Sequence, residues 1–399
     1  MILKNDKKDT KRIITTRGIL TIERTVLRPK EESGLEKLKE EEKIRSIVPL
    51  DIVLGIDRLP FKMTREMMCE VAFWAQNQGS FKSAETIIKK VHGVGVAAET
   101  VRQIADYVGK IVFDEDTREA ELLVSNMRKM SFSKDKSGVL YIQMDGAALN
   151  TRQKNKEGTT WRENKLGMVF SSDNIRSHTN KKGETVKTIL KKEYTSYVGG
   201  VEQFKKYLFA CAVKNGYEGY KTTVVLGDGA TWIRNICDEI FPDAVQILDL
   251  YHLCENTYEY AKAIFKNDEL QYKPWAEDMI EKLKSGKKSE VVKIIKKFQK
   301  RKLPNGTVNL PTYINNNLDK IDYDQYIKKG YYVGSGAIES GNKVVLQKRL
   351  KLAGMRWNEQ TAQYLLSLRA KFESGLWNEC VVDKLLGCDF ADPSNIKNL

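Results

Sequence analysis

Apolar residues recur along this chain with two different spacings, and the change between them divides the sequence into regions. Residues 12–28 contain two β-branched runs on either side of Arg17-Gly18, which predicts two strands joined as a hairpin. Residues 64–113 carry apolar residues at helical spacing and predict three consecutive helices. From residue 138 strand-like apolar runs alternate with helical ones. The pattern therefore predicts a strand pair, a helical region and then a mixed α/β region.

The last of the three predicted helices, AAETVRQIADYVGKIV, is amphipathic. Four apolar residues at positions i, i+3, i+4 and i+7 mark one buried face: Val101, Ile104, Ala105 and Val108. This pattern leaves Arg102, Gln103 and Asp106 facing outward. A helix, the glycine-bearing turn HGVGV and a second amphipathic helix are typical of a helix-turn-helix DNA-binding unit, although a plain three-helix bundle gives the same pattern. In the first case Arg102 and Gln103 would contact DNA.

The order of elements after residue 138 predicts the fold class. The runs VLYIQMDG, TTWRENKLGMVF and KEYTSYVGG predict three strands in a meander, with a helix after them. The strand KTTVVLGDGA, another helix, the strand AVQILDL and a helix starting near His252 complete the series. Three meandering strands followed by alternating helices and strands predict an α/β protein with a ribonuclease-H-like mixed sheet. In such a sheet the catalytic carboxylates lie on the first and fourth strands.

Lysine-rich helical sequence interrupts this predicted core. Residues 282–302 contain ten Lys or Arg residues and a single acidic one, Glu290. An apolar stripe through the same segment predicts a helix whose basic face either keeps the protein soluble or contacts a phosphate backbone. We therefore expect five parts. They are an N-terminal strand pair with a charged linker (1–45), a helix-turn-helix-like domain (46–130), the first part of the core (131–252), an all-helical basic insertion (253–332) and the last part of the core (333–399).

Three acidic residues stand where a divalent cation site would need them. Asp145 and Asp228 follow the apolar runs VLYIQM and TTVVLG, and Glu339 lies in the helix-like stretch GSGAIESGNK, where Ser335 is a candidate N-cap. Mg²⁺ prefers oxygen ligands and takes only a few protein carboxylates together with substrate phosphates. Two such ions about 3.5–4 Å apart activate the attacking oxygen and stabilise the leaving oxygen in phosphodiester chemistry. The sequence therefore predicts a site for two Mg²⁺ or Mn²⁺ ions held by Asp145, Asp228 and Glu339.

A second polar pair, Asp249 and His252, follows the strand AVQIL. Residues three apart at the start of a helix share a face, so this pair would lie close to the three carboxylates or contact DNA. Capping of the helix by His252 is the alternative. On the helix that carries Glu339, the residues Lys343, Gln347 and Lys351 continue a polar stripe that would hold metal and phosphates.

Net charge supports a nucleic-acid partner. The formal charge is +14 and the isoelectric point is about 9.2, values that favour phosphate polymers. No run reaches the ~18 apolar residues that a membrane span needs. The six cysteines are scattered, without a CxxC pair, which favours reduced thiols in the cytoplasm. With only three histidines, an imidazole-rich zinc site is not expected.

Taken together, GDGATWI, LDLYHL and GSGAIESGNK followed by QKRLKLAGMRW resemble prokaryotic insertion-sequence transposases related to the Mutator-like superfamily. These are DDE enzymes with a ribonuclease-H-like core interrupted by a helical insertion, and the resemblance covers roughly residues 60–380. It implies that Asp145, Asp228 and Glu339 form the catalytic triad, with Asp249 and His252 as its DxxH motif. It also implies basic and aromatic contacts to DNA after the Glu helix, for which the candidates are Lys343, Gln347, Lys348, Arg349, Lys351, Arg356 and Trp357. For Trp357, packing in the core is an equal explanation.

The resemblance implies an activity and partners. The enzyme would cleave transposon-end phosphodiesters and join the freed 3′-hydroxyl to target DNA, as a dimer or larger oligomer on double-stranded DNA, in the bacterial cytoplasm and nucleoid. Relatives often carry a cysteine-based zinc segment after the strand pair, whereas residues 24–34 contain no cysteine. The helix-turn-helix candidate would then recognise the ends, or the chain is N-terminally shortened. A ribonuclease-H-like nuclease without transposition activity and an inactive DNA-binding regulator are the alternative functions.

Overall fold

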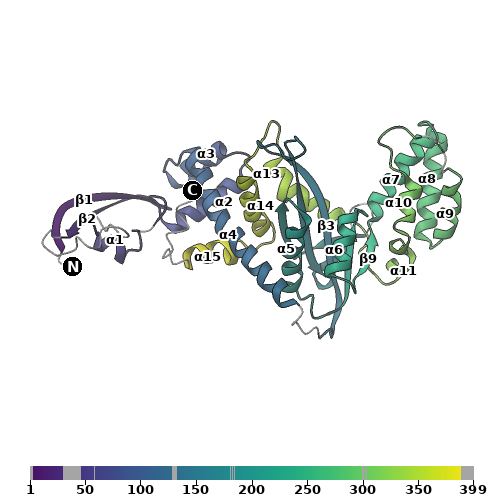
Figure 1. The fold of residues 1–399 in the computed structure, drawn as a ribbon, viewed down its shortest axis with the longest axis horizontal. Coiled ribbons are helices and arrows are strands. Elements are labelled where there is room, and N and C mark those ends of the chain that lie inside the picture. The colour runs from purple at the N-terminus through teal and green to yellow at the C-terminus, as the bar shows by residue number, and fades with distance from the viewer. Residues whose placement is uncertain are drawn as a thin grey trace. The chain divides into compact units, whose positions relative to one another are not determined.

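The computed structural model describes residues 3–29, 46–57, 59–127, 133–179, 181, 183, 185–298, 301 and 303–387. The chain forms two compact units, one made of residues 1–113 with 376–399 and the other of residues 114–375. Together they give a mixed α/β protein with a five-stranded mixed sheet and many helices (Figure 1). No helix in the described ranges is long and apolar enough to cross a membrane.

The first unit begins with the predicted hairpin. Strands β1 (Leu3–Thr15) and β2 (Gly18–Pro29) pair antiparallel and run further than the sequence pattern indicated. Gly18 adopts φ +121°, a value that suits glycine in the tight connection between them. A short helix, α1 (Pro49–Val53), buries Asp51, whose carboxylate accepts from Lys11 and Arg24 of the hairpin. The expected linker segment 30–45 lies outside the described residues.

The three helices predicted in residues 64–113 are confirmed as α2 (Arg65–Asn77), α3 (Phe81–His92) and α4 (Ala98–Asn126). Ser80 caps α3 as expected, because its hydroxyl accepts from the Ser83 amide at 3.0 Å. The predicted apolar face of α4 is buried. The prediction that Asp106 faces outward is wrong: its side chain is buried and accepts from Arg102. Helix α15 (Asp383–Gly387) also belongs to this unit.

The second unit is built on a sheet with the strand order β7-β4-β3-β8-β9. Strands β3 and β4 pair antiparallel, as do β4 and β7, whereas β8 and β9 run parallel to β3. The meander followed by parallel strands is therefore confirmed. The strands are β3 (Lys136–Asn150), β4 (Trp161–Ser171), β7 (Glu193–Val198), β8 (Tyr220–Gly227) and β9 (Val245–Leu248).

Helices cover both faces of this sheet. On one face α5 (Val201–Lys214) and α6 (Thr231–Ile240) pack on alternate β3 residues such as Leu140 and Ile142. On the other face lies α12 (Gly336–Asn342), which contacts β3 and β4. It continues through a π-helical turn (Lys343–Gln347) into α13 (Lys348–Leu350). Helix α14 (Glu359–Glu373) packs on the edge strand β7.

The sequence pattern missed one element and merged two others. Residues 175–189 form a separate two-stranded ribbon, β5 (Ile175–Thr179) with β6 (Thr185–Ile189), which no earlier expectation included. The single helix expected over 282–302 is wrong, because Gly286, at φ +78°, separates two helices there. The helices between β9 and α12 are α7 (Leu250–Ile264), α8 (Glu269–Lys284), α9 (Lys288–Lys296), α10 (Leu310–Asn315) and α11 (Tyr323–Lys328).

Candidate active site

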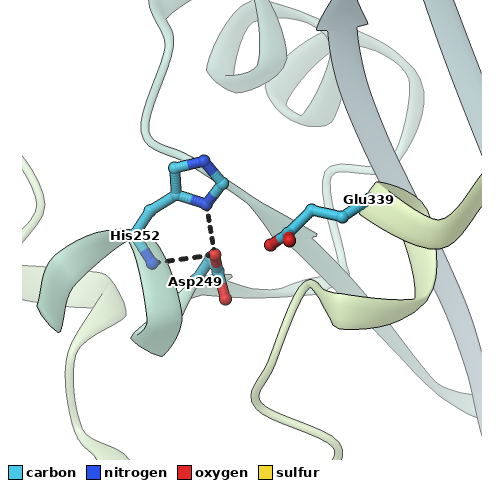
Figure 2. A group of neighbouring side chains, drawn as sticks. All are labelled: Asp249, His252 and Glu339. Carbon is cyan, nitrogen blue, oxygen red and sulfur yellow. Dashed lines mark hydrogen bonds and ion pairs between the residues drawn. The ribbon is translucent and has the colours of Figure 1, made fainter. Parts of the chain in front are cut away.

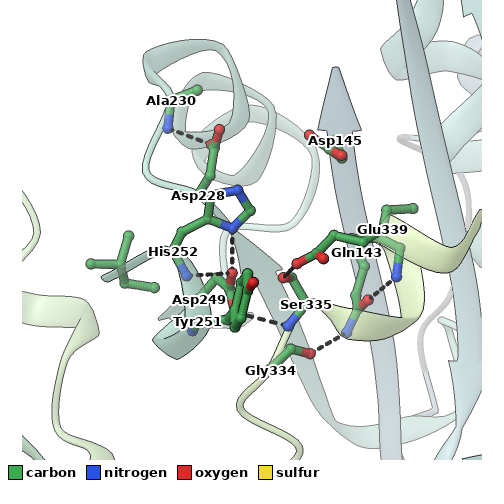
Figure 3. Close-up of polar contacts among 12 residues, drawn as sticks. Gln143, Asp145, Asp228, Ala230, Asp249, Tyr251, His252, Gly334, Ser335 and Glu339 are labelled. Atoms are coloured by element: carbon green, nitrogen blue, oxygen red, sulfur yellow. Dashed lines mark hydrogen bonds and ion pairs between the residues drawn. The ribbon is translucent and has the colours of Figure 1, made fainter. Parts of the chain in front are cut away.

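Strand register brings three aspartates to one face of the sheet. In the parallel ladder Gln143 of β3 pairs with Leu226 of β8, so two residues further along each strand Asp145 and Asp228 lie at the same level. Because side chains alternate between faces, both point to the face on which Gln143 lies. Asp249 follows β9 in the same way, since its amide donates to the Gly227 carbonyl oxygen at 2.8 Å. Figure 3 shows the aspartates around one space, with Glu339 entering from α12.

Asp145 is not at a strand end, contrary to the sequence pattern. The parallel pairing of β3 with β8 stops at Gln143, but β3 continues to Asn150 because β4 pairs with it from Leu140 to Asn150. The Asp145 side chain therefore stands on a strand that is held on one side and open on the other. Its two oxygens accept from the Gly146 amide at 2.8 Å and from the Asn342 side-chain amide at 2.5 Å.

Asp228 lies on a tight turn between β8 and α6. Its Oδ1 accepts from the Ala230 amide at 2.9 Å, and its backbone carbonyl accepts from the Tyr313 hydroxyl of α10 at 2.7 Å. The intervening Gly229 has φ +88°, and a Cβ there would come within 3.0 Å of both Leu248 and Asn317. Glycine is thus required at this position for both conformation and space.

Alternate residues of β3 fasten the segment that carries Glu339. The Tyr141 hydroxyl accepts from the Tyr332 amide at 3.2 Å. Gln143, which is fully buried, donates to the Gly334 carbonyl at 3.2 Å and accepts from the Ile338 amide at 3.1 Å. With the bond between Asp145 and Asn342, three successive residues on one face of the strand hold residues 332–342 in place. This arrangement positions α12 and therefore Glu339.

Asp249 is a buried carboxylate with all of its hydrogen-bonding positions in use. Oδ1 accepts from the amides of Tyr251 and Ser335, and Oδ2 accepts from the amide and the Nδ1 atom of His252, the latter at 2.5 Å (Figure 2). Burial by itself would raise the pKa of Asp249, but the bonds from His252 and Ser335 outweigh it and lower the pKa. Asp249 is therefore an ionised N-cap of α7 that fixes the orientation of His252.

His252 carries a positive charge next to the carboxylates. The hydrogen bond that His252 donates to Asp249 is the main cause that raises the pKa of His252 to about 9, with further contributions from the charges of Asp228 and Asp145. Near neutral pH the imidazole is therefore protonated. Its charge partly balances a cluster that would otherwise consist of carboxylates alone.

Glu339 lies in the first turn of α12, where its carboxylate accepts from the Ser335 hydroxyl at 2.5 Å. Ser335 occupies the N-cap position, but the prediction that its side chain caps the helix is wrong, because the hydroxyl donates to Glu339 instead. Ligand atoms of Asp249, His252 and Glu339 lie within 4.8 Å of one another. These three residues do not make a convincing cation site, since Asp249 has no free lone-pair direction and His252 is protonated.

Asp145 and Asp228, the two other carboxylates, fit a cation better than Asp249 and His252 do. Burial is the main cause that raises the pKa of Asp145, and the charge of Asp228 raises it further, whereas the bonds from Asn342 and Gly146 and the charge of His252 lower it. Close by, Oδ1 of the buried Asn342 has no hydrogen-bond partner among the described residues. The carboxylates and the unsatisfied amide oxygen offer oxygen donors, the ligand type that Mg²⁺ and Mn²⁺ prefer. The structure places Asp145, Asp228 and Glu339 on one face of the sheet, but among the described residues only Asp249, His252 and Glu339 form a group of acidic or imidazole side chains whose ligand atoms all lie within 4.8 Å of one another.

The structure separates the expected DNA-contacting residues into two groups. Five are exposed on or after the helix of Glu339: Lys343, Gln347, Lys348, Lys351 and Arg356. Arg349 and Trp357 are buried, so the expected DNA contact is wrong for Arg349, and for Trp357 the alternative of core packing is favoured. Trp357 donates from Nε1 to the Leu350 carbonyl at 2.9 Å, and the Arg349 guanidinium lies 4.9 Å from the centre of its ring. Both residues are packed inside the protein, where DNA does not reach them.

Arg102 and Gln103, the two expected DNA-contacting residues of the first unit, differ in how accessible they are to a phosphate or base. Gln103 is exposed on α4. Arg102 is partly exposed, and its guanidinium already pairs with Glu99 and Asp106 on the same helix. A phosphate would have to compete with these carboxylates, so Gln103 is the more accessible of the two residues.

Sequence reasoning missed Gln143 and Asn342, which hold the site together. A glutamine inside the apolar run VLYIQMD was a usable signal, because a polar side chain in a buried strand needs a partner. Asn342 lies three residues after Glu339 and so shares a face of the helix with it, which was a second signal.

The fold and site therefore define a mixed α/β protein with a cluster of carboxylates beside the C-terminal ends of parallel strands. The chain belongs to an uncharacterised protein family (UPF0236), whose model matches residues 4–384. No curated protein matches the chain.

Proposed function

We propose that this protein is a metal-dependent DNA transposase of the DDE type, with Asp145, Asp228 and Glu339 as its catalytic carboxylates. The observation that carries the proposal is the convergence of these three residues, from β3, the end of β8 and α12, on one face of the sheet. Their sequence separation is large, and hydrogen bonds from Asn342, Ala230 and Ser335 orient them. Such preorganisation of acidic groups is what phosphodiester chemistry requires.

The strand order supports a ribonuclease-H-like core. The meander of β3, β4 and β7 is followed by the parallel strands β8 and β9, which gives the spatial order β7-β4-β3-β8-β9. Along the chain, Asp145 lies on the first strand of this sheet, β3, and Asp228 directly follows the fourth, β8. Helices α7–α11, which lie between β9 and α12 in the chain, would be the helical insertion of such a core. The positive net charge and the exposed cations Lys343, Lys348 and Lys351 favour a DNA phosphate backbone as the partner.

The residues of the chain have distinct roles in this proposal. Divalent cations bound by the three carboxylates would supply Lewis-acid activation of the attacking oxygen and stabilisation of the leaving oxygen. Asp249 holds the His252 ring, and the protonated imidazole provides a cation for a phosphate oxygen near the carboxylates. Lys343 and Gln347, one and two turns beyond Glu339, extend the polar surface along which a DNA strand would lie.

A cleavage and strand-transfer assay tests the proposal. Purified protein would be incubated with Mg²⁺ or Mn²⁺, labelled DNA from its own flanking genomic repeats and a supercoiled target. We expect joined products from the wild type and none from Asp228→Asn, with DNA binding retained. Cleavage without joining would replace transposition by nuclease activity. Binding without cleavage would replace it by a regulatory function.

A further inference from the structure

A small pocket lies at the far end of the β3–β4 hairpin, away from the carboxylates. It has a volume of about 240 Å³, and its walls include Asn150, Trp161, Leu352, Met355, Lys351 and Arg356. Every charged residue that lines it within the described part of the chain is basic. Pockets for cofactors and drug-sized ligands usually have volumes of about 300–1,000 Å³, so this one suits a single ring system.

The pocket is built on a well-anchored frame. Trp357 donates its amide to the Asn150 carbonyl at 3.0 Å, and its own carbonyl accepts from the Arg152 amide at 2.8 Å. Both bonds tie the segment after α13 to the end of β3. The Trp357 indole, buried beneath the segment, donates to the Leu350 carbonyl. The loop 351–356 is therefore attached at both of its ends, and the pocket is preformed.

Two features of the pocket are unusual for a surface that binds nothing. Trp161 leaves 51% of its surface exposed although it is the largest apolar side chain in the hairpin, and Leu352 beside it is 43% exposed. Asn150, directly opposite Trp161 in the ladder, has a buried side-chain oxygen without a hydrogen-bond partner among the described residues. A flat aromatic face, an unsatisfied polar group and two cations at one place are complementary to a planar heterocycle that carries a phosphate.

We propose that this pocket binds an unpaired DNA base, stacked on Trp161, while Lys351 and Arg356 pair with the adjacent phosphates. The inference rests on DNA as the partner in the proposed function. Five residues of strand separate Asp145 from Asn150, a distance of about 17 Å. This is roughly the rise of five nucleotides along one strand of a duplex. The pocket would thus contact a base a few nucleotides from the phosphate that is cleaved.

Binding of a normal and an abasic DNA strand separates stacking from charge. Fluorescence anisotropy would compare a labelled single-stranded oligonucleotide with the same strand lacking bases, in EDTA, for the wild type and Trp161→Ala. We expect the wild type to bind the normal strand roughly 5- to 150-fold more tightly, the range for stacking one base on an aromatic ring. Trp161→Ala should bind both strands equally, and Trp161→Phe should restore most of the difference.

A second variant tests the role of the cations. Lys351→Gln should weaken both strands to the same extent and reduce the salt dependence of binding by about one phosphate contact. If Trp161→Ala keeps the wild-type preference for the normal strand, or if the wild type has no such preference, the pocket does not bind a base. A wild type that binds neither strand also contradicts the pocket proposal, whereas a wild type that fails to bind duplex DNA in the same assay contradicts the proposed function itself. Circular dichroism of each variant confirms that it is folded.

Discussion

The side-chain amide of Asn342 donates to Asp145 Oδ2 at 2.5 Å, although 197 positions separate the two residues. The bond orients one oxygen of a carboxylate that is proposed to bind metal. A residue that hydrogen-bonds to a metal ligand affects the metal affinity indirectly, because it fixes the orientation of that ligand. We expect Asn342→Ala and Asn342→Leu to weaken Mn²⁺ binding about 10- to 100-fold. Electron paramagnetic resonance of free Mn²⁺ in a titration measures the affinity without any need for activity.

A matched control exists elsewhere in the same unit. Asn215 also donates to a carboxylate, Glu193 Oε2, at 2.8 Å, but at the start of the edge strand β7. Asn215→Ala should leave Mn²⁺ affinity unchanged. Equal Mn²⁺ affinities for wild type and Asn342→Ala would contradict the positioning role.

Asp249 should be important for stability even without metal. The Asp249→Ala variant removes the acceptor for three amides and the imidazole, and it leaves the His252 charge partly buried without its partner. We expect the free energy of unfolding to fall by about 3–5 kcal/mol, the range for breaking a buried ion pair. Urea denaturation in EDTA measures the loss. Asp268, the exposed N-cap of α8, is the control, because Asp268→Ala should cost only about 1 kcal/mol.

The pair of Asp249 and His252 also predicts a pH dependence of stability. The pKa of His252 is about 9 in the folded protein and about 6.5 when unfolded, so the folded state binds the proton more tightly. This contribution is complete below pH 6.5 and is lost as the pH rises through 9. We expect the wild type to lose about 2 kcal/mol of unfolding free energy over this interval relative to His252→Gln, because the ring is partly exposed. Parallel pH profiles for the two proteins would contradict the assignment.

Arg369 should stabilise the helix that carries Glu339. It is buried in α14, and its guanidinium donates to the carbonyls of Val345, at 2.8 Å, and Val344 in the π-helical turn. A π-helical turn bonds i to i+5 and so shifts the register of a helix. We expect Arg369→Met to lower the free energy of unfolding by about 3–5 kcal/mol, since it leaves Glu373 and these carbonyls without their cation. Lys371, which also lies on α14 and pairs with Asp116 of α4, offers a comparison for the loss of a buried cation that does not contact the π-helical turn.

Periodicity predicted the elements of the fold well where one face is buried. The strands β3 and β8 were found because their apolar runs are long. The ribbon of β5 and β6 was missed, since most of its described side chains are exposed and its sequence carries no apolar run. Contacts such as Gln143 with Gly334 were beyond prediction, because sequence alone does not show which distant segment satisfies a buried polar group.

The error on Arg349 has a physical cause. Arg349 lies four residues after Val345 and three after Leu346, so helical spacing places it on the buried face despite its charge. Its pKa is lowered to about 10, mainly by burial and further by the charge of Arg369. A basic residue in a basic segment is therefore not sufficient evidence of a DNA contact.

The attachment of residues 332–342 to alternate positions of β3 has a consequence for the order of synthesis. A nascent chain that has emerged from the ribosome as far as Leu248 contains every strand of the sheet and both Asp145 and Asp228, but neither Glu339 nor Asn342. Such a chain can form the sheet before the last carboxylate exists, because domains begin to fold during translation. Residues 332–342 must then pack onto β3, and this step is slow because the contacting residues are far apart in the sequence. A nascent chain therefore lacks the third carboxylate until Glu339 has been synthesised and its helix has packed onto β3.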